Sequence, residues 1–237
     1  MKRASASGSD RYLVVGCKAW NRRVFAERIA TFPGQWSFIG TREELALERI
    51  DELQPRYVFF LHWSWKVSDA MLARHECVCF HMTDVPYGRG GSPLQNLIVR
   101  GHRETKLTAL RMSAEFDAGP VYLKRPLSLE GSAEEILIRA SELSAEMIAQ
   151  IVAKHPRPRA QRGTVTVFKR RRPEESAIQA LGSTSALHDF IRMLDAEGYP
   201  RAFLDHGGFR YEFSRATQRD GRIVADVSIH PLSKEVS

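Results

Sequence analysis

Residues 57–81 read YVFFLHWSWKVSDAMLARHECVCFH, and this stretch decides the predicted fold. It contains two apolar runs, residues 57–61 and 77–80, on either side of a short helical pattern over 68–74. Both runs are apolar without alternation, which is typical of strands that are covered on both faces. A strand, a helix and a second buried strand in this order predict parallel strands joined by a helix, and therefore an α/β protein.

The same alternation continues towards the N-terminus. Strands are predicted at 12–15 and 36–39, because both stretches are short and apolar. The first is followed by a helix with Asn21 as its cap, and the second by a helix opened by a capping box of Thr41 and Glu44. Together with residues 57–81 this order indicates a mostly parallel, doubly wound sheet with right-handed crossovers.

Towards the C-terminus two more helix starts and two more strands are predicted. Ser92 is expected to cap a helix with Gln95 as the reciprocal partner, and Ser132 with Glu135 opens a long amphipathic helix. Strands are expected at residues 105–112 and 121–127. The sheet is therefore predicted to extend to about residue 127 and to be covered by the long helix.

Three segments make up the predicted domain organisation. Residues 1–10 are expected to form a flexible tail, 11–155 the main domain, and 156–237 a linker with a small α+β subdomain. The evidence for the subdomain is a helical pattern after residue 183 and two hairpin turns, at Gly207–Gly208 and Asp220–Gly221.

Composition narrows the class of protein. The 237 residues carry a formal net charge of +7, which suits anionic partners such as phosphates, folates, nucleotides or nucleic acid. Apolar residues make up 43% of the chain, enough for a sizeable core, and no run is long enough to span a membrane. The N-terminus shows no secretory pattern, and three cysteines without a disulfide framework indicate a reducing compartment, the cytoplasm.

Two residues of the predicted main domain can perform acid–base chemistry. His81 ends the strand at 77–80, and Asp117 follows the strand at 105–112. Ligands of open α/β sheets bind beyond the carboxyl ends of the strands, so the two side chains are expected to meet if their strands are neighbours. A carboxylate beside an imidazole suits a general base near neutral pH, whereas the alternative is a purely structural histidine. No metal-ligand cluster and no serine nucleophile motif is evident.

Three motifs resemble the folate-dependent formyltransferases, the family that includes the methionyl-tRNA and amino-sugar enzymes. HMTDVPYGRGGSPLQ (81–95) is similar without gaps to the family's H-P-S-L-L-P-x-x-R-G-x-x-P-x-Q segment, and MSAEFDAG (112–119) to its M-x-x-x-x-D-x-G loop. RRRPEES (170–176) is similar to the R-R-x-P-E-D-S segment that follows the family's core. The core resemblance covers roughly residues 10 to 150, and a weaker one continues through residues 170–176. It implies a Rossmann-like formyltransferase fold, 10-formyltetrahydrofolate as donor and a primary amine as acceptor, while the residues themselves lead us to expect no metal.

The resemblance also implies roles for individual residues. His81 would take the proton of the attacking amine or, as imidazolium, hold the oxyanion, while Asp117 would orient His81 and relay the proton. Cys79 stands where the family has an asparagine that donates to the oxyanion, and a thiol is a poor donor. Thr83 and Asn96 are the candidate replacements, and a catalytically weak folate- or nucleotide-binding relative is the alternative.

Further candidates concern the two substrates. The loop after residue 61 corresponds to the family's pterin-binding loop, and Arg89 with the two glycines after it can approach a phosphate. Plain packing at the sheet edge and an ordinary loop are the respective alternatives. The candidates for folate binding are Trp63, Trp65, Lys66, Val67, Met112 and Phe116, and those for the second substrate are Arg89, Gly90 and Gly91.

The expected acceptor substrate follows from a narrower resemblance, to one branch of the family. W-S-W-K (63–66), followed by the motif at 81–95, resembles the short amino-sugar N-formyltransferases of the pseudaminic-acid type. That resemblance implies a UDP-linked 4-amino-4,6-dideoxy hexose and a possible homodimer. The alternative is a methionyl-tRNA formyltransferase-like enzyme. The basic run Lys169–Arg172 could bind nucleic acid, although a solvated linker is the preferred interpretation, and no membrane partner is expected.

Overall fold

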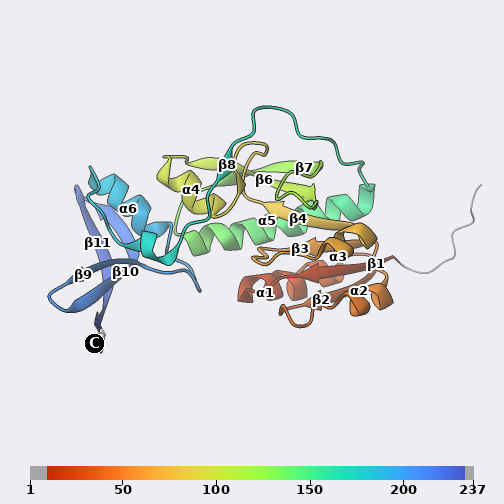
Figure 1. Cartoon of the computed structure of the whole chain (residues 1–237), viewed down its shortest axis with the longest axis horizontal. Coiled ribbons are helices and arrows are strands. Elements are labelled where there is room, and N and C mark those ends of the chain that lie inside the picture. The colour runs from red at the N-terminus through yellow and green to blue at the C-terminus, as the bar shows by residue number, and fades with distance from the viewer. Residues whose placement is uncertain (1–9, 233–237) are drawn as a thin grey trace, which may run out of the picture. The chain divides into compact units, whose positions relative to one another are not determined.

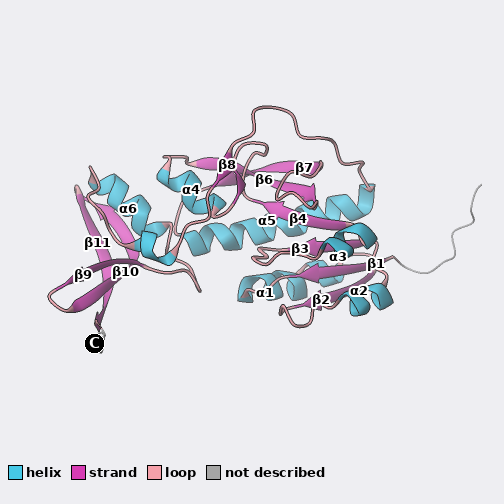
Figure 2. Ribbon diagram, in the orientation of Figure 1, coloured by secondary structure: helices cyan, strands magenta, loops and turns pink. Residues whose placement is uncertain are grey.

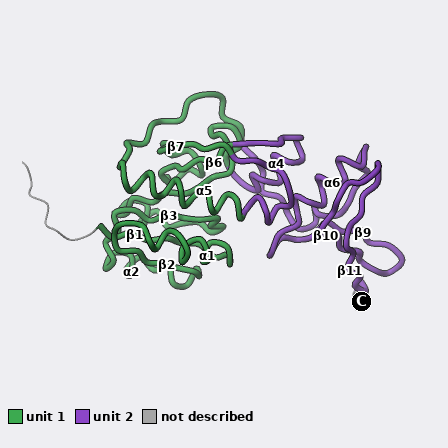
Figure 3. The backbone as a smooth tube through the Cα atoms, turned by 180° about the vertical axis from the view of Figure 1, so that it is seen from behind, with its two compact units in different colours: residues 1–89, 106–126, 138–166 green, residues 90–105, 127–137, 167–237 purple. Residues whose placement is uncertain are grey.

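The structure is a computed structural model, and it describes residues 10–232. Contacts divide the chain into two compact units (Figure 3). Unit 1 comprises residues up to 89, 106–126 and 138–166, and unit 2 comprises 90–105, 127–137 and the residues from 167 onwards. Apart from residue 10, the predicted flexible tail lies outside the described residues, and the predicted domain boundary at 155 remains a prediction.

A six-stranded sheet forms the centre of unit 1 (Figure 1). Its order is β2-β1-β3-β4-β6-β7, with β1 to β4 parallel and β6 antiparallel to β4. The predicted α/β class and mostly parallel sheet are therefore confirmed, with a reversal of direction after β4. The strands are β1 (Arg11–Val15), β2 (Gln35–Ile39), β3 (Tyr57–Phe60), β4 (Cys77–His81), β6 (Glu104–Arg111) and β7 (Val121–Ser128).

Helices cover both faces of this sheet (Figure 2). Ile50 of α2 and Met71 of α3 pack in one cluster with alternate strand residues such as Leu13 and Val58, because successive strand residues point to opposite faces. α1 is joined to α5 by a hydrogen bond from Asn21 to Ser141. The helices are α1 (Ala19–Glu27), α2 (Leu47–Leu53), α3 (Asp69–Arg74), α4 (Pro93–Val99), α5 (Ala133–Lys154) and α6 (Thr184–Arg192), with 3-10 turns η1 (Ile29–Thr31) and η2 (Pro173–Ser176).

The predicted capping box before α5 is present, the predicted Asn21 cap is wrong, and Ser92 occupies the N-cap position of α4 without the predicted cap bond. The Ser132 hydroxyl accepts from the Glu135 N–H, and the Glu135 carboxylate accepts from the Ser132 N–H. Asn21 is the third residue of α1, where its side chain accepts from the Lys18 N–H, so the helix begins earlier than predicted. Ser92 does precede α4, but its hydroxyl accepts from the Arg171 N–H and makes no cap bond.

The Thr41–Glu44 box forms, but it does not begin a helix. The Thr41 hydroxyl accepts from the Glu44 N–H, and the Glu44 carboxylate accepts from the Gly40 N–H. α2 begins only at Leu47, so the box closes an isolated turn. A local hydrogen-bond motif thus predicts a turn reliably but not its continuation into a helix, which depends on packing.

Unit 2 contains an antiparallel sheet of β9 (Ala202–His206), β10 (Phe209–Arg219) and β11 (Arg222–Pro231), which confirms the predicted small α+β part and both hairpin turns. A short pair, β5 (Arg89–Gly90) with β8 (Val167–Phe168), completes the strands. No helix of the described residues is long and apolar enough to cross a membrane.

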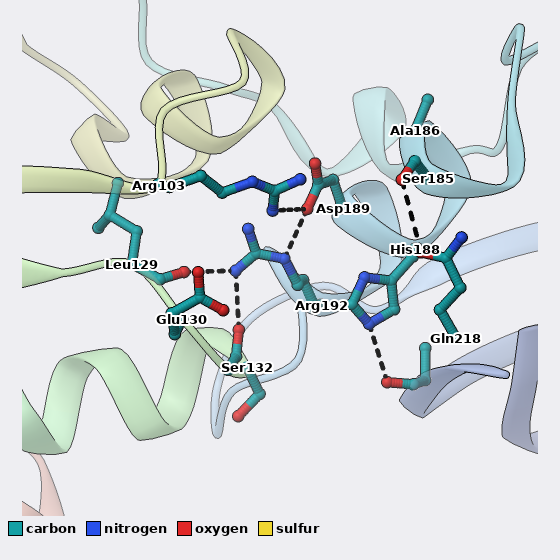
Figure 4. A network of polar contacts seen from close by, with 12 residues as sticks. Arg103, Leu129, Glu130, Ser132, Ser185, Ala186, His188, Asp189, Arg192 and Gln218 are labelled. Carbon is teal, nitrogen blue, oxygen red and sulfur yellow. Dashed lines mark hydrogen bonds and ion pairs between the residues drawn. The ribbon is translucent and has the colours of Figure 1, made fainter.

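A buried arginine fastens α6 within unit 2 (Figure 4). The Arg192 Nε donates to Asp189 at 2.6 Å, and its Nη1 donates to the carbonyl oxygens of Leu129 and Gly131 at 2.6 and 2.8 Å. Arg103 also donates to Asp189. A buried charge is tolerated only when it is paired and hydrogen-bonded, and this network provides both.

Candidate active site

His81 ends β4 with its imidazole nearly buried. Its side chain is 8% exposed. The Nε2 atom lies 2.8 Å from the carbonyl oxygen of Gly88, and Nδ1 lies 3.4 Å from Oδ1 of Asp117. A carbonyl oxygen can only accept, so Nε2 carries a hydrogen. The nitrogen that can exchange a proton is therefore Nδ1, and it faces the carboxylate.

This geometry is compatible with the proton relay predicted for Asp117, and it adds the Gly88 carbonyl as a group that orients the ring. The ring is oriented by the Gly88 carbonyl on its far side, whereas the carboxylate lies beside the nitrogen that exchanges the proton. When Nδ1 gains a proton the ring becomes an imidazolium, and the adjacent carboxylate stabilises that charge. Asp117 is thus placed to act on charge and proton transfer.

The route by which Asp117 reaches His81 differs from the prediction. Because β6 runs antiparallel to β4, its end at Arg111 lies opposite Val78, near the start of β4. The loop after β6 must therefore double back to His81. It does so with Asp117 in the left-handed region, at φ 54°, a conformation that aspartate tolerates better than most residues.

Gly119 makes this doubling back possible. A Cβ atom at this position would lie 1.8 Å from the carbonyl oxygen of Arg111, which is far inside van der Waals contact. The glycine of the M-x-x-x-x-D-x-G pattern is therefore required by a close approach between the loop and the end of β6.

Neither Cys79, in the asparagine slot, nor the two candidate replacements Thr83 and Asn96 has a free, strong hydrogen-bond donor in the structure. Burial, and secondarily the Asp117 charge, raise the pKa of the Cys79 thiol, so it stays neutral and is a weak donor. The fully buried Thr83 hydroxyl donates to the Gly88 carbonyl at 3.2 Å.

The Asn96 side chain is fully engaged within unit 2. Its amide donates to the carbonyls of Gly91, Ser92 and Lys169, and its Oδ1 accepts from Arg100. Asn96 therefore fastens backbone segments together.

Four of the predicted residues gather around one apolar cluster of unit 1. Val67 belongs to the cluster, and Trp63, Cys79 and Met112 are partly buried against it. The Trp63 Nε1 is buried, with no hydrogen-bond partner in the described part of the chain. An unpaired buried indole N–H costs free energy, so a ligand acceptor at this point would be favoured.

The remaining predicted folate residues are exposed. Trp65 packs edge-on against Trp63 with ring centroids 4.7 Å apart, and 39% of its surface is accessible. Phe116, directly before Asp117, is 66% exposed. Lys66 is exposed and forms an ion pair with Asp69 at 3.4 Å. The accessible rings of Trp65, in the loop after β3, and Phe116, in the loop after β6, offer stacking surfaces for a heteroaromatic ligand.

Arg89 and the two glycines after it make protein contacts at the positions expected to approach a phosphate. Arg89 donates through Nε and Nη2 to the side-chain oxygen of Gln161, at 3.1 and 2.9 Å. A Cβ on Gly90 would lie 2.6 Å from the Phe168 carbonyl oxygen, and one on Gly91 would lie 2.4 Å from Arg170. These glycines permit close backbone packing.

Two contributors to the site were missed by the sequence analysis. The Gly88 carbonyl holds His81, and the Gln161 amide donates to the carbonyls of Asp117 and Gly119 at 2.6 and 2.8 Å. Gly88 lies inside the recognised motif, whereas Gln161 lies in a polar stretch without periodicity. Among the described residues, no group of three His, Cys, Asp or Glu side chains could hold a metal ion.

A doubly wound sheet with an imidazole and a carboxylate at the end of a central strand defines an α/β protein with an acid–base pair. Comparison with known proteins specifies the family. The structure of methionyl-tRNA formyltransferase from Clostridium thermocellum is 42% identical, with a TM-score of 0.89 over 94% of this chain and 99% of that chain. Residues 173–230 match the family described as "Methionyl-tRNA formyltransferase, C-terminal domain". The chain belongs to the formyltransferase family.

Curated relatives are similar in sequence to this chain over part of their own length. The methionyl-tRNA formyltransferase of Thermotoga neapolitana is 29% identical over 113 residues, which are 46% of this chain and 36% of the relative. The matched segment thus spans little more than a third of that relative.

More distant structures show the fold alone. HypX from Aquifex aeolicus, solved in complex with tetrahydrofolic acid, is 17% identical with a TM-score of 0.72 over 90% of this chain and 40% of that chain. A likely sugar N-formyltransferase from Mycobacterium tuberculosis is 15% identical, with a TM-score of 0.65 over 92% of this chain and 96% of that chain. A sugar N-formyltransferase from Shewanella is 14% identical, with a TM-score of 0.61 over 95% of this chain and 99% of that chain. The expected nearness to the amino-sugar enzymes is therefore not supported, whereas the alternative, a methionyl-tRNA formyltransferase-like chain, is.

Proposed function

We propose that the protein transfers a formyl group from 10-formyltetrahydrofolate to the primary amine of methionyl-tRNA. The observation that carries this proposal is the His81–Asp117 contact at 3.4 Å in a chain of the formyltransferase family. The partly buried Trp63 and the exposed Trp65 and Phe116 provide apolar and stacking surfaces that suit a pterin.

The chemistry follows from the atoms of the pair. The amine nitrogen attacks the formyl carbon, and a C–N bond forms as the carbonyl oxygen becomes an oxyanion. The protonated Nδ1 of His81 donates to that oxygen, while the Asp117 carboxylate accepts a proton from the amine. Collapse of the intermediate breaks the bond from the formyl carbon to N10, and N10 takes the proton as tetrahydrofolate leaves. An oxyanion donor of this kind contributes about 3–4 kcal/mol.

Support for a tRNA acceptor comes from similarity and charge. The relatives from Clostridium thermocellum and Thermotoga neapolitana are methionyl-tRNA formyltransferases, and the match at 173–230 is to the C-terminal domain of that protein. The net charge of +7 favours a polyanionic partner. The proposal replaces the expected nucleotide sugar, which serves as the second acceptor in the test.

Mass spectrometry of the acceptor tests the proposal. The protein is incubated with 10-formyltetrahydrofolate and either methionyl-tRNA or a UDP-4-amino-4,6-dideoxy hexose. We expect one formyl group on methionyl-tRNA, and a rate that falls steeply with added salt. His81→Ala should abolish transfer, and replacement of the exposed His206 by alanine is the matched control. Formylation of the sugar alone would overturn the acceptor, and formylation of neither would overturn the activity.

A further inference from the structure

The segment between α5 and β8 contacts the two groups that lie beside His81, which are the Asp117 loop and the residues around Gly88. We call residues 159–166 the strap; they form part of the stretch that the sequence analysis treats as a linker (Figure 1). The strap begins at Arg159, whose N–H and C=O exchange hydrogen bonds of 2.8 and 2.7 Å with Val121. It therefore starts in register beside the first residue of β7, a few residues after the Asp117 loop.

The side chain of Gln161 holds the Asp117 loop. Its amide nitrogen donates to the carbonyls of Asp117 and Gly119, at 2.6 and 2.8 Å. Both carbonyls follow the Cα atom of Asp117, whose left-handed conformation directs the carboxylate towards His81. One amide group thus fixes the backbone immediately after this residue.

Arg89 sets the orientation of that amide. Its Nε and Nη2 both donate to the Gln161 oxygen, so the amide nitrogen must face the two loop carbonyls. The Arg89 Nη1 also contacts Glu115, at 3.3 Å, within the same loop. The Arg89 side chain is only 13% exposed, which limits competition from water.

The C-terminal end of the strap holds the backbone around Gly88, whose carbonyl lies beside His81. The Thr166 N–H donates to the Pro86 carbonyl, and the Thr166 carbonyl accepts from the N–H groups of Gly88 and Arg89, with lengths of 3.0–3.1 Å. These three bonds fix residues 86–89, whose Gly88 carbonyl accepts from Nε2 of His81. One segment therefore sets both the ring orientation and the position of the carboxylate.

We propose that the strap is a positioning element of the active site, and that Gln161 is the positioning residue that holds the Asp117 carboxylate opposite Nδ1 of His81. This inference rests on the proposed function, since it assigns a role within the same site. It predicts that transfer depends on the two N–H donors of Gln161, whereas folate binding depends little on them.

Three glutamine variants test whether the N–H donors of Gln161 are needed for formyl transfer. Gln161→Leu removes the donors and the acceptor, while Gln161→Glu keeps an acceptor for Arg89 but loses the donors to the loop carbonyls. Gln150→Leu is the matched control, because Gln150 accepts an exposed hydrogen bond from Arg125 in the part of the chain that the structure describes. We expect kcat to fall about 10- to 100-fold in both Gln161 variants, with KM for the folate within about threefold.

The two Gln161 variants also distinguish a role in positioning the Asp117 carboxylate from a role in stabilising the fold. If Gln161 served only to anchor Arg89, Gln161→Glu would retain wild-type kcat, and this result would overturn the proposal. Equal loss of kcat in both variants, with thermal unfolding within a few degrees of the control, supports it. Because Gln161→Glu retains the Arg89 contact, it still provides the test if Gln161→Leu fails to fold.

A spectroscopic readout is independent of turnover. The ¹⁵N resonances of the His81 ring report which nitrogen is protonated and what surrounds it. In Gln161→Leu we expect the Nδ1 resonance to move, because the carboxylate is displaced, and the Nε2 resonance to stay, because Thr166 still holds the Gly88 segment. Unchanged resonances at both nitrogens would overturn the inference, even if formyl transfer were established. Altered resonances without any transfer would leave the positioning intact and remove only the proposed reaction.

Discussion

Replacing Asp117 by asparagine isolates the charge that faces His81. Asparagine has nearly the same shape and also tolerates the left-handed conformation found here, at φ 54°. At an effective dielectric constant of about 20, two unit charges separated by 3.4 Å interact by about 5 kcal/mol. The imidazole is 8% and the carboxylate 16% exposed, so solvent screening reduces but does not remove this energy.

We therefore expect Asp117→Asn to lose about 2–4 kcal/mol of transition-state stabilisation, or about 30- to 1000-fold in kcat. The assay is the initial rate of formyl incorporation at saturating folate, with KM determined separately. Asp220→Asn is a matched control, since Asp220 also has a positive φ, of 49°, but lies in an exposed hairpin turn. A kcat within threefold of wild type in Asp117→Asn would refute the charge argument.

Three further predictions concern the same unit. Gly119→Ala should lower stability by about 1–3 kcal/mol and reduce kcat, because its Cβ would overlap the Arg111 carbonyl; thermal unfolding and turnover check this against Gly182→Ala, where the Cβ meets nothing within 4 Å. Cys79→Asn introduces an amide donor beside His81 and should raise kcat about tenfold or more, measured as initial rate; an unchanged or lower rate would show that the thiol position does not face the oxyanion. Burial lowers the pKa of His62 to about 4, so the folded state resists protonation that the unfolded state accepts below about pH 6.5. Stability should therefore fall as pH drops from 7 to 5, and in urea unfolding His62→Asn should shrink that loss by about 1–2 kcal/mol, whereas an equal loss in both proteins would contradict the linkage.

The central sheet and the acid–base pair could be predicted because their signals are local. The continuous apolar runs at 57–61 and 77–80 correspond to β3 and β4, and the spacing of the motifs that begin at His81 and Met112 pointed to one site. The way in which His81 and Asp117 meet could not be predicted, however. The carboxyl ends of β4 and β6 do not lie together, because β6 is antiparallel to β4 and the loop after β6 has to return to His81.

Other contacts could not be predicted from sequence spacing. Asn96 and Arg89 carry the chemistry of an oxyanion donor and a phosphate ligand, yet both are engaged by groups about 70 residues away in the chain, Lys169 and Gln161. A side chain's hydrogen-bonding capacity can be read from its type, but its partner depends on which backbone groups the fold leaves unpaired beside it.

The amino-acid sequence by itself determined the strand and helix order, the buried character of the strands and the residue types available for catalysis, since these depend on periodicity and side-chain chemistry. Only the tertiary structure decided that Nδ1 of His81 faces the carboxylate and that the strap holds both of its neighbours. The physical reason is that a hydrogen bond requires its atoms to lie within about 3 Å, and the chain reaches that proximity only where separate segments pack together.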